Sequence, residues 1–155
     1  MMNRKKILAE IQKEFEVTIP PAIRRIIIEL ELRPLWREIG ETLRQVSPTE
    51  SVDTFRLMNL MKDYVNREGI DPLPEIQRSV EEMEKKGYLV VERKSPSNYF
   101  LAPAFAEAIR IARLLDEKII KPTVEELQKD AELKKVENLH QAIRRDIYAA
   151  LRPEK

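Results

Sequence analysis

The chain contains no cysteine, only three glycines and a single histidine. The absence of cysteine excludes disulfides, thiolate zinc sites and cysteine nucleophiles. Three scattered glycines leave no GxGxxG, P-loop or GxSxG motif, so dinucleotide, P-loop and serine-hydrolase chemistry have no support. No apolar run approaches the roughly 18 residues that suggest a membrane span. The start MMNRKKILAEIQKEF alternates in charge after its basic residues, unlike a signal peptide, so we expect a cytoplasmic protein.

Groups suited to catalysis are also scarce. His140 lies on the last expected helix, one turn after Glu137. Without cysteine, a lone histidine is more often a surface or interface residue than a metal ligand. Carboxylates are abundant, but they alternate with basic residues on helix faces, which is the pattern of salt bridges. We therefore predict no enzymatic activity, no catalytic residue, no metal site and no cofactor.

Neither sign of charge dominates. Lysine and arginine total 28 against 27 aspartate and glutamate, for a net charge of +1. Residues 1–47 carry nine basic and seven acidic residues, 48–103 eight and ten, and 104–155 eleven and ten. No segment has the basic excess that binding to a phosphate backbone normally requires. The many Glu, Lys and Arg residues, with few Asn and Gln, are typical of thermophile proteins.

Apolar residues recur at helical spacing through most of the chain. They predict helices over about 4–15, 21–32, 34–46, 48–67, 72–86, 104–119 and 123–151. β-branched residues in 21–32 make a strand the alternative there, but the 3.6-residue spacing of Ile23, Ile27 and Leu30 favours a helix. Ser47 with Glu50, and Thr123 with Glu126, have the spacing of capping boxes that begin helices.

Two short runs rich in β-forming residues follow Gly87. YLVVER and NYFLAP are joined by KSPS, which predicts a β-hairpin. The helix before them is expected to bury Ile76, Val80 and Met83 and to end at Gly87.

The apolar helix TFRLMNLMKDYV, the helix end VEEMEKKGYL and the hairpin YLVVERKSPSNYFLAP together resemble the winged-helix superfamily, in the style of the MarR- and PadR-like regulators. The resemblance covers residues 50–103. It implies a recognition helix over 72–86, a wing at the hairpin and DNA as the ligand. Only REGIDPL separates the helix ending near Arg67 from the one starting near Pro72. Either the short second helix of the motif has collapsed to a turn, or the helix over 34–46 belongs to the motif.

The expected fold is therefore mainly α. Residues 1–47 form N-terminal helices packed on the core, 48–103 form a winged-helix domain with one β-hairpin, and 104–155 form C-terminal helices suited to dimerisation. The last helix, of about 28 residues, would span roughly 42 Å, longer than a hundred-residue domain is across. A second copy would cover its apolar stripe, or the helix folds back across the N-terminal helices after Pro122. The dimerisation residues in the first case are Leu127, Val136, Leu139, Ile143, Ile147 and Leu151.

Two groups of polar residues are the candidate DNA contacts. On the exposed face of the 72–86 helix, Arg78–Glu82 and Glu81–Lys85 have the spacing of ion pairs, so this face can neutralise itself and lie simply in solvent. The hairpin tip offers donors for backbone or minor-groove contact, although polar turns are often only solvated. The DNA-binding residues predicted are Gln77, Arg78, Lys85, Arg93, Lys94, Ser95, Ser97 and Asn98.

The function expected is that of a dimeric, DNA-binding transcriptional regulator. In this hypothesis the 72–86 helix enters the major groove of double-stranded DNA and the hairpin tip contacts the backbone. Alanine at Arg93 and Lys94 should then weaken binding to all sequences and flatten its salt dependence. The alternative is a protein–protein interaction module or assembly subunit with the same fold, which the net charge of −2 over residues 48–103 favours.

Overall fold

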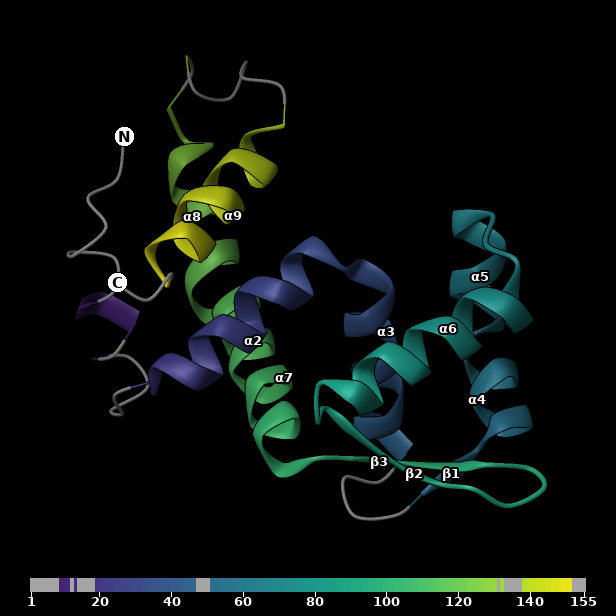
Figure 1. The fold of residues 1–155 in the computed structure, drawn as a ribbon. Helices are drawn as coiled ribbons and strands as arrows, with labels where there is room; N and C mark the ends of the chain where they lie inside the picture. The colour runs from purple at the N-terminus through teal and green to yellow at the C-terminus, as the bar shows by residue number, and fades with distance from the viewer. Residues whose placement is uncertain are drawn as a thin grey trace. The chain divides into compact units, whose positions relative to one another are not determined.

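A computed structural model describes residues 9–11, 13, 19–46, 51–130, 132 and 138–151 of the protein (Figure 1). The structure is mainly helical, with one small three-stranded antiparallel sheet. Two compact units form: residues 30–109 make one, and residues 1–29 with 110–155 make the other. The two units divide the chain differently from the three segments expected from the sequence, because the two ends of the chain share one unit.

The unit of residues 30–109 combines helices with the sheet. It contains α3 (Pro34–Val46), α4 (Thr54–Leu60), α5 (Lys62–Glu68), α6 (Pro72–Lys85) and the start of α7 (Pro103–Leu115). Its strands are β1 (Val52–Asp53), β2 (Leu89–Glu92) and β3 (Asn98–Leu101), in the order β1-β3-β2. β2 and β3 form the expected hairpin, with Leu89 opposite Leu101 and Glu92 opposite Asn98.

The strand β1 is a correction to the sequence analysis. The helix expected over 48–67 begins only at Thr54, because Val52 pairs with Tyr99 and Asp53 pairs with Asn98. The Asp53 side chain then caps α4 by accepting a hydrogen bond of 2.7 Å from the backbone N–H of Arg56. The expected capping box at Ser47 and Glu50 lies outside the described residues. A bend at Met61 also divides the expected helix into α4 and α5.

Apolar side chains of the five helices α3 to α7 and of the sheet meet in the core of this unit. Trp36, Tyr88 and Phe105 form an aromatic cluster: the Tyr88 and Phe105 rings stack with centroids 5.1 Å apart, and Trp36 meets Tyr88 edge to face at 6.1 Å. Ile76, Val80 and Met83 are buried on α6, as expected. Other core residues, each no more than 6% exposed, are Ile39, Leu43, Leu57, Met61, Val65, Leu89 and Tyr99.

The other unit is built from helices near both ends of the chain. It takes most of α2 (Pro21–Leu32), the end of α7, the π-helical turn η1 (Asp116–Ile120), α8 (Lys121–Leu127) and α9 (Leu139–Ala150). Of the helix expected over 4–15, residues 9–11 and 13 are described and are helical, and Ile11 is fully buried. The bounds of α2 agree with the expected helix over 21–32.

Pro122 does not end the helix that contains it, and a wider, π-helical turn comes just before it. α7, η1 and α8 follow one another without a break, and Pro122 lies in the first turn of α8. Proline has no N–H for the carbonyl four residues earlier, and its ring crowds that carbonyl, so a π-helical turn just before it relieves the conflict. Thr123 does not cap a helix: its hydroxyl donates to the carbonyl of Ile119.

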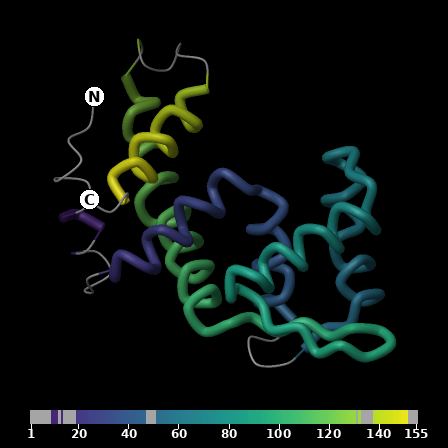
Figure 2. Tube along the Cα trace, viewed as in Figure 1, coloured from purple at the N-terminus to yellow at the C-terminus, as the bar shows by residue number. Residues whose placement is uncertain are grey.

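The single long C-terminal helix predicted from the sequence is wrong. α8 ends at Leu127, residues 128–130 form turns, and α9 begins at Leu139 after Asn138, whose φ of 59° is left-handed. α8 and α9 lie side by side (Figure 2). Arg144 on α9 donates to the Asp116 carboxylate of η1 at 2.7 Å. The length argument for a partner helix therefore no longer applies.

Among the residues described, no helix is both long enough and apolar enough to cross a membrane.

Candidate nucleic-acid interface

α6 is fixed at both ends by local sequence. Asp71 occupies the N-cap position and Pro72 the first turn, where a missing N–H costs nothing. Gly87 takes a left-handed φ of 79° after the last turn. The N–H of Gly87 donates to Glu84 O and the N–H of Tyr88 donates to Met83 O, both at 2.9 Å, which is a Schellman end. This glycine turns the chain from α6 into the hairpin.

A three-residue turn joins α5 to α6. It comprises Gly69, Ile70 and Asp71. Gly69 adopts a left-handed φ of 65°, and the N–H of Ile70 donates to Val65 O at 3.1 Å. Two helices connected by a turn of three or four residues that includes glycine are the pattern of a helix-turn-helix. The turn fixes the start of α6 relative to α5.

The exposed face of α6 carries the three helix residues predicted to bind DNA. Gln77, Arg78 and Lys85 are exposed, as is Glu81. Neither ion pair predicted along this face forms: within the part of the chain that is described, Arg78 and Lys85 have no carboxylate partner. Glu82 instead faces Arg33 at 3.6 Å. The guanidinium of Arg78 and the ammonium of Lys85 are thus both available to a ligand.

The two basic residues of the hairpin tip are paired with carboxylates. Arg93 donates from Nη1 and Nη2 to both oxygens of Glu84, each at 2.6 Å, and Lys94 forms an ion pair with Glu92. The hydrogen bonds from Arg93 hold the pKa of the Glu84 carboxyl below its ordinary range, and Glu84 in turn raises the pKa of Arg93. The hydrogen bond to Glu92 raises the pKa of Lys94. Neither cation stands alone at the tip.

The remaining predicted DNA contacts lie in the hairpin turn and at the start of β3. The carbonyl of Ser97 accepts hydrogen bonds from the N–H of Thr54 at 3.0 Å and from its hydroxyl at 3.2 Å. Asn98 opens β3, opposite both Asp53 and Glu92. Ser95 is exposed in the turn. The tip is therefore tied to the start of α4 through Ser97. Of these three residues, Ser95 is exposed, while Ser97 and Asn98 are partly buried.

A shallow groove of about 200 Å³ separates α6 from the hairpin. Its lining combines apolar, acidic and basic side chains: Gln77, Val80, Glu81, Glu84, Val91, Arg93, Ser97 and Tyr99. Two carboxylates, from Glu81 and Glu84, face it against the single guanidinium of Arg93. Glu84 is not among the site residues predicted from the sequence, because its partner Arg93 comes close only once the hairpin folds back against α6.

The residues predicted for dimerisation lie mostly inside one chain. Leu139, Ile143, Ile147 and Leu151 are at most 5% exposed within the unit of residues 1–29 and 110–155. Leu127 is half-buried. Val136 lies outside the described residues. Burial within the unit gives the first four a role in the core that needs no second copy.

No cluster suited to a metal ion occurs among the described residues: nowhere do three histidine or carboxylate side chains gather at one point. His140 is exposed on α9. Comparison with protein-family models, with curated proteins and with solved structures found no match for this chain.

Proposed function

We propose that residues 34–101 form a winged-helix domain that binds double-stranded DNA, and that the protein acts as a transcriptional regulator. The observation that carries the proposal is the helix-turn-helix of α5, Gly69 to Asp71, and α6, followed at once by the β2–β3 hairpin. α3 supplies the helix before the motif and β1 the third strand of its sheet. This order supports the second of the two alternatives from the sequence, in which residues 34–46 belong to the motif.

The electrostatics of α6 support contact with DNA on one side of the helix. Arg78 and Lys85 are exposed and have no ion-pair partner in the described segments. An unpaired guanidinium can form bidentate hydrogen bonds with guanine or with phosphate oxygens. Gln77, also exposed, has the donor and acceptor needed for adenine. In this proposal the three side chains contact base edges in the major groove or the phosphates beside it.

A protein–protein interaction module is the second candidate, and the charge balance of α6 favours it. The helix carries four carboxylates, from Glu75, Glu81, Glu82 and Glu84, against Arg78 and Lys85, for a net charge of −2. Large apolar side chains are also exposed on this unit, including Phe55 at 71%, Leu73 at 49% and Val90 at 56%. Exposed apolar groups beside acidic ones suit a protein partner better than a phosphate backbone.

Salt-dependent binding to a random DNA duplex separates the two candidates. Fluorescence anisotropy would measure the affinity at several salt concentrations, with the protein's mass checked by light scattering. The proposal predicts a linear fall of log K with log salt, with a slope of about −0.9 for each phosphate neutralised. No binding at low salt would reject DNA and leave the protein-interaction module.

Paired variants locate the contacts. Arg78→Gln with Lys85→Gln should weaken binding and flatten the salt slope. Arg145→Gln with Lys121→Gln removes the same charge from exposed positions on α9 and α8, and serves as the control. Alanine at both Arg93 and Lys94 tests the wing: affinity equal to that of the unsubstituted protein would remove the hairpin tip from the interface.

A further inference from the structure

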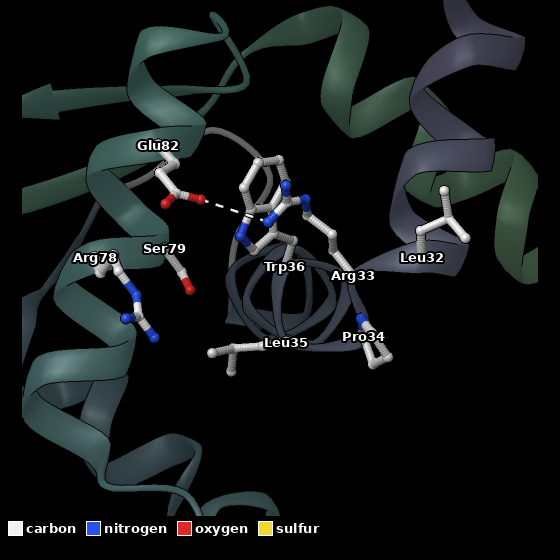
Figure 3. Close-up of a pocket in the computed structure, with 8 residues that line it drawn as sticks. All are labelled: Leu32, Arg33, Pro34, Leu35, Trp36, Arg78, Ser79 and Glu82. Carbon is white, nitrogen blue, oxygen red and sulfur yellow. Dashed lines mark ion pairs between the residues drawn. The ribbon is translucent and has the colours of Figure 1, made fainter.

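A second pocket, of about 420 Å³, opens between the beginning of α3 and one side of α6 (Figure 3). This volume falls within the range of small-ligand sites. Apolar side chains of the α2–α3 junction form one wall and polar side chains of α6 form the other. The lining residues are Leu32, Arg33, Pro34, Leu35, Trp36, Arg78, Ser79 and Glu82.

Two arginines reach this pocket from opposite walls. Arg78 extends from α6 toward α3, beside the hydroxyl of Ser79, which points the same way (Figure 3). Arg33 comes from the α3 side, with its guanidinium 4.5 Å above the Trp36 ring. Two guanidinium groups and one carboxylate, that of Glu82, give the pocket a net positive charge.

The Arg33–Glu82 pair leaves the Arg33 donors available. Its shortest N···O distance is 3.6 Å, beyond that of a good hydrogen bond. Both side chains are about half exposed, at 51% and 44%, so the attraction between them is weakened by solvent. An incoming oxyanion can therefore accept hydrogen bonds from Arg33 while Trp36 continues to hold its guanidinium in place.

We propose that this pocket binds one phosphate group, with Arg78 and Arg33 donating to its oxygens and the Ser79 hydroxyl donating a further hydrogen bond. The planar donor fork of arginine matches the geometry of phosphate oxygens. Two sources fit this chemistry: a backbone phosphate of DNA, which rests on the proposed function, or a free phosphate ester. In the first case α3 extends the DNA contact surface beyond α6 and the hairpin.

Titration with inorganic phosphate at constant ionic strength, with chloride as the control anion, tests the site. Trp36 is the only tryptophan, so its emission reports directly on the Arg33 guanidinium above it. A second reporter is the backbone amide shift of Ser79 in a nitrogen–proton correlation spectrum. The proposal predicts a saturable response to phosphate in both, with a dissociation constant on the order of 1 mM.

Three substitutions give opposed outcomes. Arg78→Gln, which leaves the Trp36–Arg33 contact intact, should weaken phosphate binding at least about tenfold. Glu82→Gln should strengthen it several-fold, because it removes a like charge and the competitor for Arg33; a gain of binding is not produced by a folding defect. Arg145→Gln, outside the pocket, should leave the affinity unchanged.

Competition with duplex DNA shows whether the bound phosphate belongs to DNA or to a free phosphate ester. If the duplex raises the apparent dissociation constant of phosphate, the pocket takes a DNA backbone phosphate. If phosphate binds and the duplex neither binds nor competes, the pocket is a site for a free phosphate ester. Only the proposed DNA-binding function is then rejected. The site itself is overturned by an absence of saturable response in both reporters, or by equal affinities in the unsubstituted protein and the Arg78→Gln and Glu82→Gln variants.

Discussion

Gly40 lies within α3 at a position where a methyl group has no room. A Cβ built there would be 2.7 Å from Cε2 of Phe105 and 2.8 Å from Cδ1 of Ile109. Both neighbours are fully buried, and the Phe105 ring is held against Tyr88 at 5.1 Å. The Phe105 ring therefore cannot move aside freely. The end of the Ile109 side chain is flexible, but the packed core around it limits how far it can move.

The net effect of Gly40→Ala follows from two opposing contributions. Alanine in a helix interior is favoured over glycine by about 1 kcal/mol. Inserting a methyl group into a packed core costs about 1–3 kcal/mol. We expect the free energy of unfolding to fall by about 1 kcal/mol, with the packing cost exceeding the helical gain.

Denaturant unfolding followed by Trp36 emission measures this change, and a double-mutant cycle isolates its cause. Phe105→Leu removes the ring atoms nearest to the new Cβ. In that background Gly40→Ala should become neutral or stabilising, with a coupling energy of about 1–2 kcal/mol. A stabilising Gly40→Ala in the unsubstituted protein, or additive effects in the cycle, would refute the close packing of Phe105 on α3.

Three further predictions concern charge and hydrogen bonding in the same unit. Arg93→Gln should raise the pKa of the Glu84 carboxyl toward its ordinary value, which an NMR pH titration measures. The Arg93–Glu84 pair stabilises the hairpin above about pH 4.5, and this stabilisation is lost as the pH falls through the lowered pKa of Glu84 in the folded protein. An unchanged pKa of Glu84 in the variant would contradict the pairing. Thr54→Val removes the hydroxyl that donates to Ser97 O. It should lower the free energy of unfolding by about 1 kcal/mol and speed amide exchange in the hairpin, and unchanged exchange would count against the tie. Burial is the main cause that raises the pKa of Glu38. Glu38→Gln should therefore stabilise the protein by about a few tenths of a kcal/mol near neutral pH, since Glu38 is only partly buried and solvent screens its charge. That gain should vanish in acid, where Glu38 is itself neutral, and a difference that persists there would contradict the cause.

Helix positions were predictable where the signals were local. The spacing of Ile23, Ile27 and Leu30, with prolines before and after, predicted α2 with its observed bounds. Gly87 marked the passage from α6 to the hairpin because only a residue tolerant of positive φ ends a helix in this way. The buried stripe of α6 followed from the same periodicity.

Elements that depend on distant partners were not predictable. β1 has two residues, and its pairing exists only because β3, more than forty residues later, lies beside it. The C-terminal stripe kept helical spacing through Leu139 and Ile147, because α8 and α9 each bury an apolar face in the same unit. Only Asn138, a residue type that tolerates left-handed φ, offered a sign of the interruption.

In the candidate site, too, features set by local sequence were predictable and features set by distant partners were not. Exposure of Arg78 and Lys85 followed from the periodicity of α6, because a helix that buries Ile76 and Val80 turns those positions outward. The absence of ion pairs to Arg78 and Lys85 within the described residues did not follow from it, because Glu82 turns to Arg33, which lies between α2 and α3. The pairing of Arg93 with Glu84 likewise depends on the folding of the hairpin against α6.

Contact between α6 and DNA is tested by mapping amide and side-chain NMR shifts while a short random duplex is added at low salt. Contact between α6 and DNA predicts shift changes at Gln77, Arg78 and Lys85 that saturate together and fade as salt is raised. It predicts no comparable change at exposed residues of α9 such as Arg145. Shifts confined to α9, or no shift at all at low salt, would contradict contact between α6 and DNA.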